Sequence, residues 1–185
     1  MKVLAIPGSL RRDSHNRTLL KAAGELFPPD VEYEIWDGLK QVPPYDEDDD
    51  GERPPAGVAQ LRAALAGADA LLFSTPEYNH SVPGQLKNAL DWASRPAGAG
   101  ALRNKPAAGV GASTGAFGAV WAQAELRKVL SGSGARVVEG ELALGHAHER
   151  FDAHGRLLDP NLTEELQELV DTLVAEVRPR TAVAA

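Results

Sequence analysis

One segment near the start of the chain combines residue types that bind phosphate: residues 8–16, Gly-Ser-Leu-Arg-Arg-Asp-Ser-His-Asn. Ser9 and Ser14 supply hydroxyls, Arg11 supplies a guanidinium, and a predicted helix follows directly. These groups, together with the free N–H groups of a helix start, suit a phosphate monoester. The segment has neither the Gly-Lys-Ser/Thr ending of a Walker loop nor the G-x-G-x-x-G pattern, so a dinucleotide pyrophosphate is not predicted. The alternative is a plain helix cap and turn.

A second segment is suited to holding a flat ring: residues 74–84, Ser-Thr-Pro-Glu-Tyr-Asn-His-Ser-Val-Pro-Gly. Its two prolines restrict the backbone on either side of Tyr78 and Asn79. Such a rigid loop can present N–H and C=O groups to the polar edge of a ring while Tyr78 packs nearby. The alternative is an ordinary strand-to-helix connection with a surface tyrosine.

A third segment is rich in glycine: residues 111–118, Gly-Ala-Ser-Thr-Gly-Ala-Phe-Gly. Glycines let a backbone come close to a ligand, and Ser113 and Thr114 add hydroxyls. Glycine-rich turns are common, so this segment alone indicates little.

Short apolar runs alternate with helix-like stretches along the chain, and this alternation predicts where the three segments lie. Strands are expected at residues 2–6, 31–35, 69–74, 106–111 and 135–138. Helices are expected at residues 17–27, 58–66, 83–92 and 117–130, and after residue 161, with Asn161 as cap. The alternation predicts an α/β fold, a five-stranded parallel sheet with helices on both faces. For a strand order of 2-1-3-4-5, the three segments meet beyond the carboxyl ends of the strands, where ligands bind.

Composition excludes several classes of protein. The 185 residues fit one domain, 1–185, and the absence of cysteine excludes disulfides, thiolate metal sites and thiol nucleophiles. A net charge of −7 argues against nucleic-acid or anionic-membrane partners. The first apolar run is too short for a signal peptide, so we expect a soluble cytoplasmic protein. Residues 41–57 read as an acidic insertion loop and residues 181–185 as a frayed tail.

Two of the segments, residues 8–16 and residues 76–92, resemble the NADPH-dependent FMN reductase family, which includes bacterial quinone, chromate and azo-dye reductases. The resemblance implies a flavodoxin-like three-layer sandwich with bound FMN and NADPH or NADH as electron donor. It assigns the FMN phosphate to Ser9, Arg11, Ser14 and Asn16. It assigns the isoalloxazine ring to Pro76, Glu77, Tyr78 and Asn79, and the pyrimidine or ribityl side to Ser113, Thr114 and Gly115.

The resemblance also implies an enzyme that passes two electrons through FMN to small-molecule acceptors and forms homodimers or homotetramers. No catalytic side chain is predicted, because the cofactor carries the chemistry; Tyr78 and Asn79 are the candidates for tuning the ring. Two alternatives stay open: a flavodoxin-type electron carrier, and a flavin-based redox sensor without its own NAD(P)H turnover. No metal site is expected, because residues 46–57 lack the final glutamate of a calcium loop. The sequence alone identifies no site for the 2′-phosphate of NADPH.

Overall fold

A parallel sheet forms the centre of the computed structural model, which describes residues 1–177. Its strands follow the order β2-β1-β3-β4-β5, and a sixth strand pairs with β4. The strands are β1 (Lys2–Pro7), β2 (Glu32–Ile35), β3 (Ala70–Thr75), β4 (Pro106–Ala112), β5 (Arg136–Val137) and β6 (Ala143–Leu144). Every pairing between these strands is parallel. The observed order and the parallel pairing confirm the expected parallel sheet of order 2-1-3-4-5.

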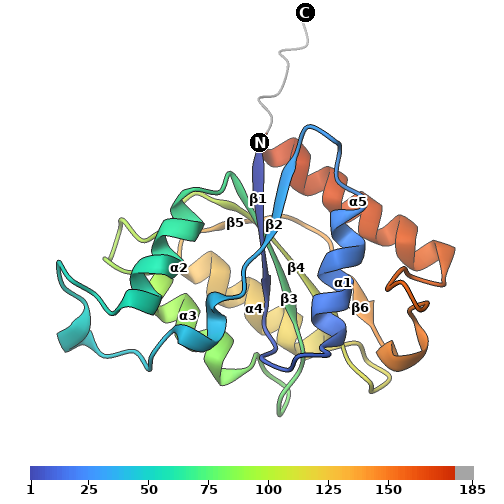
Figure 1. The fold of residues 1–185 in the computed structure, drawn as a ribbon, viewed down its shortest axis with the longest axis horizontal. Helices are drawn as coiled ribbons and strands as arrows, with labels where there is room; N and C mark the ends of the chain where they lie inside the picture. Colours follow the sequence, from blue (N-terminus) through green and yellow to red (C-terminus); the bar gives the residue numbers. More distant parts are fainter. Residues whose placement is uncertain (178–185) are drawn as a thin grey trace, which may run out of the picture.

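Helices cover both faces of the sheet (Figure 1). The α-helices are α1 (His15–Gly24), α2 (Ala56–Ala66), α3 (Gly84–Ala93), α4 (Val120–Gly132) and α5 (Pro160–Val177). Short 3-10 turns lie at η1 (Gly38–Gln41), η2 (Glu47–Asp49) and η3 (Ala147–Glu149). Helices α1 and α5 lie on one side of the sheet, and α2, α3 and α4 lie on the other (Figure 1). The fold is therefore the expected α/β three-layer sandwich.

The alternation of side chains along β1 explains why both faces are covered. Leu4 and Ile6 belong to the apolar cluster under α2, α3 and α4, whereas Val3 and Ala5 belong to the cluster under α1 and α5. All four side chains are at most 2% exposed. A strand that is apolar on both faces must be covered on both, so this short run by itself favours a central position in the sheet.

Three details differ from the expectations. The sheet has the additional strand β6, which pairs with β4 beyond the point where β5 ends. Helix α4 begins at Val120 rather than at residue 117, because Gly118 and Ala119 adopt left-handed backbone conformations. Helix α5 begins at Pro160, and the Asp159 carboxylate, not Asn161, accepts the first free N–H group.

Two further expectations concern the ends and loops. The predicted tail, residues 181–185, lies outside the described residues. Within residues 41–57, Asp50 forms an ion pair with Arg62 of α2 at 2.8 Å, which attaches the acidic loop to the body of the protein. Among residues 1–177, no helix has the length and apolar character needed to cross a membrane.

Candidate functional site

The loops after β1, β3 and β4 lie together at the carboxyl edge of the sheet, at the bottom of Figure 1. They enclose a cavity of about 270 Å³. Nine of the predicted site residues line it: Ser9, Arg11, Ser14, Asn16, Pro76, Glu77, Tyr78, Ser113 and Thr114. The other two, Asn79 and Gly115, lie outside the lining. The convergence follows from the parallel sheet, because the carboxyl ends of neighbouring parallel strands share one edge.

The N-terminus of α1 opens at this cavity with unused donors. Ser14 precedes the helix, is 3% exposed, and its hydroxyl forms no hydrogen bond within residues 1–177. No side chain caps the helix, and no acidic residue occupies its first turn. The N–H groups of the first turn and the Arg11 guanidinium are therefore available to an anion.

Close backbone contact fixes the start of this loop against the neighbouring strand. The Gly8 N–H donates to the Ser74 carbonyl at 2.8 Å. A Cβ atom at position 8 would lie 2.9 Å from the Leu86 side chain and 3.1 Å from that same carbonyl. Glycine at position 8 therefore lets β1 turn into the loop without moving the end of the Leu86 side chain or crowding the Ser74 carbonyl.

Asn16 connects the first loop to the end of β4 through its side chain. Its Nδ2 donates to the Ala112 carbonyl at 2.9 Å, and its Oδ1 accepts from the Ala112 N–H at 3.0 Å. The Ser74 hydroxyl donates to the same Oδ1 at 2.8 Å. Asn16 is 2% exposed, and its side chain joins the ends of β3 and β4 to the start of α1, with one amide hydrogen left for a ligand.

A tight turn at the tip of the second loop sets the position of Tyr78. The N–H groups of Tyr78 and Ser81 each donate to the other's carbonyl, at 3.0 and 3.1 Å. Asn79 and His80 between them both have positive φ, 52° and 61°. This is the pattern of a two-residue hairpin turn, in which asparagine is favoured. Tyr78 is left 52% exposed at the cavity, while Asn79 serves the turn.

The Glu77 carboxylate lies at the N-terminus of α4. Its Oε2 accepts the N–H groups of Trp121 and Ala122 at 3.1 and 3.2 Å. Only 15% of the side chain is exposed. A carboxylate at a helix N-terminus satisfies free donors and favours the helix dipole, so Glu77 attaches the second loop to the helix that follows the third.

The third loop is held against the segment around β6. The Ser113 and Gly115 carbonyls accept N–H groups from Ala147 and His146, both at 3.0 Å. Gly118 has φ of 58°, and a Cβ atom there would lie 2.2 Å from the Ala143 backbone. Glycine in this loop therefore permits close packing of backbone on backbone, in addition to any approach of a ligand.

The structure places His15 and Ala112 at the cavity as well. The pKa of His15 is lowered from 6.5, first by burial and then by the charges of Arg11 and His148. Its ring stacks on Phe151 with centroids 6.5 Å apart. The sequence indicated His15 only through its position, because it lies inside the predicted phosphate-binding segment, residues 8–16. Ala112 carries no polar side chain and could not be found from residue type.

Comparison with known proteins agrees with this geometry. Residues 1–149 match the family described as NADPH-dependent FMN reductase. This chain belongs to the NADPH-dependent FMN reductase family. The family assignment expected from residues 8–16 and 76–92 is thereby confirmed.

Relatives within the family resemble this chain over nearly its whole length. A 2-hydroxy-1,4-benzoquinone reductase from Burkholderia is 40% identical over 181 residues, covering 97% of this chain and 98% of the relative. An NAD(P)H-dependent FMN reductase from Pseudomonas aeruginosa is 43% identical over 179 residues, covering 96% of each chain. The solved structure of FerB, a flavoenzyme NAD(P)H:(acceptor) oxidoreductase from Paracoccus denitrificans, is 35% identical, with a TM-score of 0.83 and coverage of 95% and 96%.

Flavodoxin is a more distant neighbour of this FMN reductase family member. A Pseudomonas aeruginosa flavodoxin has a TM-score of 0.58 at 16% identity, covering 97% of this chain. This likeness confirms the flavodoxin-like fold that the sequence resemblance implied.

Proposed function

We propose that this chain forms one FMN-binding domain that oxidises NAD(P)H and passes two electrons to small-molecule acceptors such as quinones, azo compounds, chromate or free flavin. The observation that supports this most is the single cavity shared by nine residues from three loops, next to the uncapped N-terminus of α1. Family membership supports the same conclusion.

The residues at one end of the cavity fit a phosphate group. The Ser14 hydroxyl and the first-turn N–H groups of α1 are unused donors, and Arg11 supplies positive charge. Burial lowers the pKa of the neighbouring His15, and the charges of Arg11 and His148 lower it further. We assign Ser9, Arg11 and Ser14 to the phosphate of FMN, and we assign Asn16 to holding their loop in place.

The other end of the cavity fits a flat ring. Pro76 and Tyr78 provide apolar and aromatic surface, and Ser113 and Thr114 provide hydroxyls. FMN, when bound, supplies the chemistry of accepting a hydride and releasing two electrons. The protein binds the ring, orients it through the three loops, and leaves Tyr78 half exposed beside the place where substrates arrive.

Quinones are the acceptors that the relatives favour. The Burkholderia relative is named for a hydroxybenzoquinone, and a Pseudomonas putida relative, 38% identical over 182 residues, is named a quinone reductase. The exposed aromatic side chain of Tyr78, at the cavity, would suit a flat aromatic acceptor.

We also propose that the protein forms a homodimer or homotetramer. Phe117 is 67% exposed and Trp121 is 42% exposed, and their rings contact each other at a centroid distance of 5.1 Å. Exposed aromatic neighbours of this kind are typical of a protein–protein surface. A cytoplasmic location stays a prediction from the sequence.

A visible spectrum tests the proposed activity. The protein is reconstituted with FMN and kept without oxygen, and NADPH is added, followed by a benzoquinone. We expect NADPH to bleach the bound-flavin band and the quinone to restore it. A bound flavin that neither NADPH nor NADH bleaches would contradict the enzyme and favour a carrier or a redox sensor. Failure to bind FMN would contradict all three.

A further inference from the structure

A second cavity lies on the other side of the first loop, between that loop and the segment that follows β2. Its volume is about 390 Å³. Ser9 and Arg11 line both this cavity and the flavin-site cavity, so the two are neighbours separated by one loop. We refer to it below as the β2-side cleft.

The β2-side cleft is positively charged in an otherwise acidic protein. Its lining has a formal charge of +3, from four cations, Arg11, Arg12, Arg17 and Lys40, and one carboxylate, Asp37. The whole chain carries −7. A cleft of one sign within a surface of the other concentrates ligands of opposite charge, which here are anions.

The one carboxylate in the cleft is already neutralised. Both Asp37 oxygens accept hydrogen bonds from the Arg17 guanidinium, Nη2 to Oδ2 at 2.9 Å and Nη1 to Oδ1. Arg17 also lowers the pKa of Asp37, so this group is charged and occupied at neutral pH. Asp37 therefore offers little repulsion to an incoming anion.

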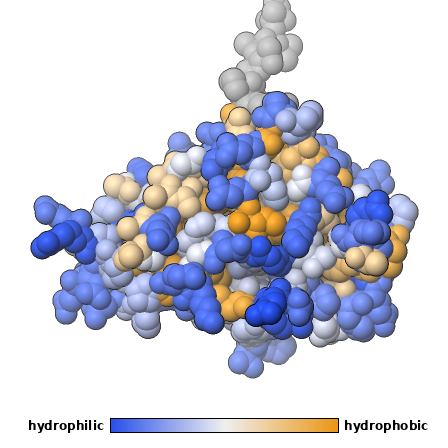
Figure 2. Space-filling view, viewed as in Figure 1, coloured by the Kyte–Doolittle hydropathy of each residue, from blue (hydrophilic) through white to orange (hydrophobic). Residues whose placement is uncertain are grey.

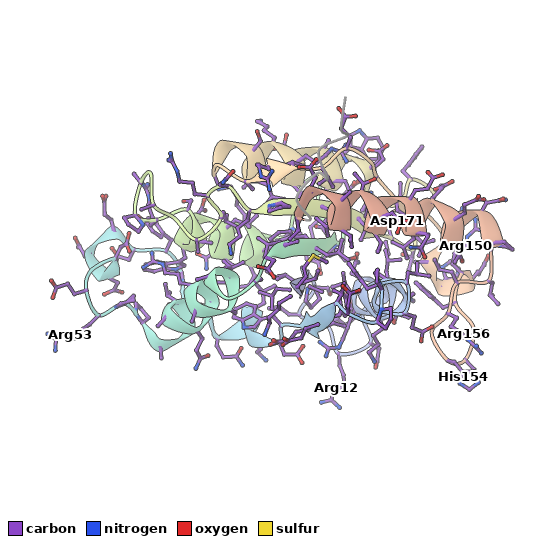
Figure 3. All side chains as sticks on the ribbon, turned by 90° about the horizontal axis from the view of Figure 1, so that it is seen from above. Arg12, Arg53, Arg150, His154, Arg156 and Asp171 are labelled. Atoms are coloured by element: carbon purple, nitrogen blue, oxygen red, sulfur yellow. The ribbon has the colours of Figure 1, made fainter. Side chains whose placement is uncertain are left out.

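Two of the cations have no partner. Within residues 1–177, Arg12 and Lys40 form neither an ion pair nor a side-chain hydrogen bond. Both are exposed, and Figure 3 shows Arg12 reaching away from the body of the protein. Unpaired, exposed cations that border one cleft, Arg12 from the first loop and Lys40 from η1, fit a group with more than one negative charge, such as a phosphate monoester.

Most of the remaining lining is apolar or aromatic, and Ser9 and Gln41 are its polar members. Pro7, Leu10, Trp36 and Leu39 contribute to it, and Leu10 is 50% exposed. Figure 2 shows hydrophobic and hydrophilic residues side by side on the face of the molecule that it draws. An apolar wall beside unpaired cations suits a heterocyclic base that carries a phosphate.

We propose that the β2-side cleft binds the adenosine 2′-phosphate end of NADPH and makes this enzyme prefer NADPH to NADH. The proposal rests on the proposed function, which requires a pyridine nucleotide beside the flavin site. NADPH differs from NADH only by that phosphate, so cations that contact it separate the two donors. In this proposal Arg11 binds the phosphate of FMN, and Arg12 and Lys40 bind the 2′-phosphate of NADPH.

Binding of a substrate fragment tests the proposal without turnover. Adenosine 2′,5′-bisphosphate and AMP are titrated by calorimetry into the protein at saturating FMN, so that the flavin site is not free for them. We compare the wild type with Arg12→Gln/Lys40→Gln. The matched control is Arg53→Gln, because Arg53 is exposed at a distant end of the molecule (Figure 3). The ratio of kcat/KM for NADPH to that for NADH is measured on the same proteins.

We expect the bisphosphate to bind more tightly than AMP, and the double variant to weaken it by about tenfold with little effect on AMP. The NADPH/NADH ratio should fall by a similar factor, while Arg53→Gln changes neither. Equal binding of the two fragments, or an unchanged double variant, would overturn the proposal, as would competition between the bisphosphate and FMN. If the wild type does not prefer the bisphosphate to AMP but NADH still reduces its flavin, only this inference is contradicted. If the wild type prefers the bisphosphate but neither NADPH nor NADH reduces its flavin, only the proposed function is contradicted.

Discussion

The Asn16 side chain pairs with the Ala112 backbone as a strand would, donating to its carbonyl at 2.9 Å and accepting from its N–H at 3.0 Å. The two residues are 96 positions apart: Asn16 lies in the first turn of α1, directly after the phosphate loop, and Ala112 ends β4. This buried contact joins two of the three loops of the flavin site. The geometry of the site therefore depends on a side chain that has little capacity left for a ligand.

Replacing Asn16 should destabilise the protein as well as the site. Asn16→Ala leaves the Ala112 N–H and carbonyl without partners at a buried position. We expect a loss of about 2–4 kcal/mol in the free energy of unfolding, because each unsatisfied buried group costs about 1–3 kcal/mol. Urea unfolding measures this. Asn161→Ala, at an exposed position of α5, is the matched control and should change stability by less than about 0.5 kcal/mol. Equal stability of the two variants would contradict the role of Asn16.

Glu77 should act mainly through α4. Glu77→Ala removes the acceptor of the Trp121 and Ala122 N–H groups and should cost about 1–2 kcal/mol. Glu77→Gln retains an oxygen acceptor and should recover part of that loss. Thermal unfolding of both variants checks this ranking of stabilities, with Glu164→Ala at an exposed position of α5 as the control. The account fails if glutamine and alanine are equivalent at position 77.

His15 should make stability depend on pH. Its pKa is lowered in the folded protein by burial, Arg11 and His148, so the unfolded chain binds the proton more readily. This contribution to stability is complete above pH 6.5 and is lost as the pH falls from there toward the lowered pKa. His15→Gln should lose less stability than the wild type on acidification through that range. Urea unfolding at several pH values measures this, with the exposed His154→Gln as control. The same slope of unfolding free energy against pH in the wild type and in His15→Gln would contradict the prediction.

The sheet was predictable from sequence because each central strand is a continuous apolar run, as in Val3 to Ile6, followed by turn residues. Strand β6 could not be predicted: it has two residues, and only its pairing with Gly111 and Ala112 defines it. The cap of α5 was misplaced because Asp159 and Asn161 both favour such positions, and the backbone path decides between them.

The sequence could predict those site residues whose type and loop position both indicate ligand binding. Ser9, Ser14 and Tyr78 fall at the cavity because loops after parallel strands share one edge. The pairing of Glu77 with α4 and the closeness of Lys40 to the first loop depend on tertiary structure. No local pattern indicates either, because residues 40 and 77 lie far along the chain from their neighbours in space.

Titration of FMN and of riboflavin into the protein, followed by flavin fluorescence, tests the central claim that the first loop holds the phosphate of FMN. The two ligands differ only in that phosphate. We predict that the protein binds FMN more tightly than riboflavin by about 100-fold, through charge-assisted hydrogen bonds. Arg11→Gln should reduce that preference by about tenfold, and Arg53→Gln should preserve it. Equal affinity for FMN and riboflavin in the wild type would contradict the account.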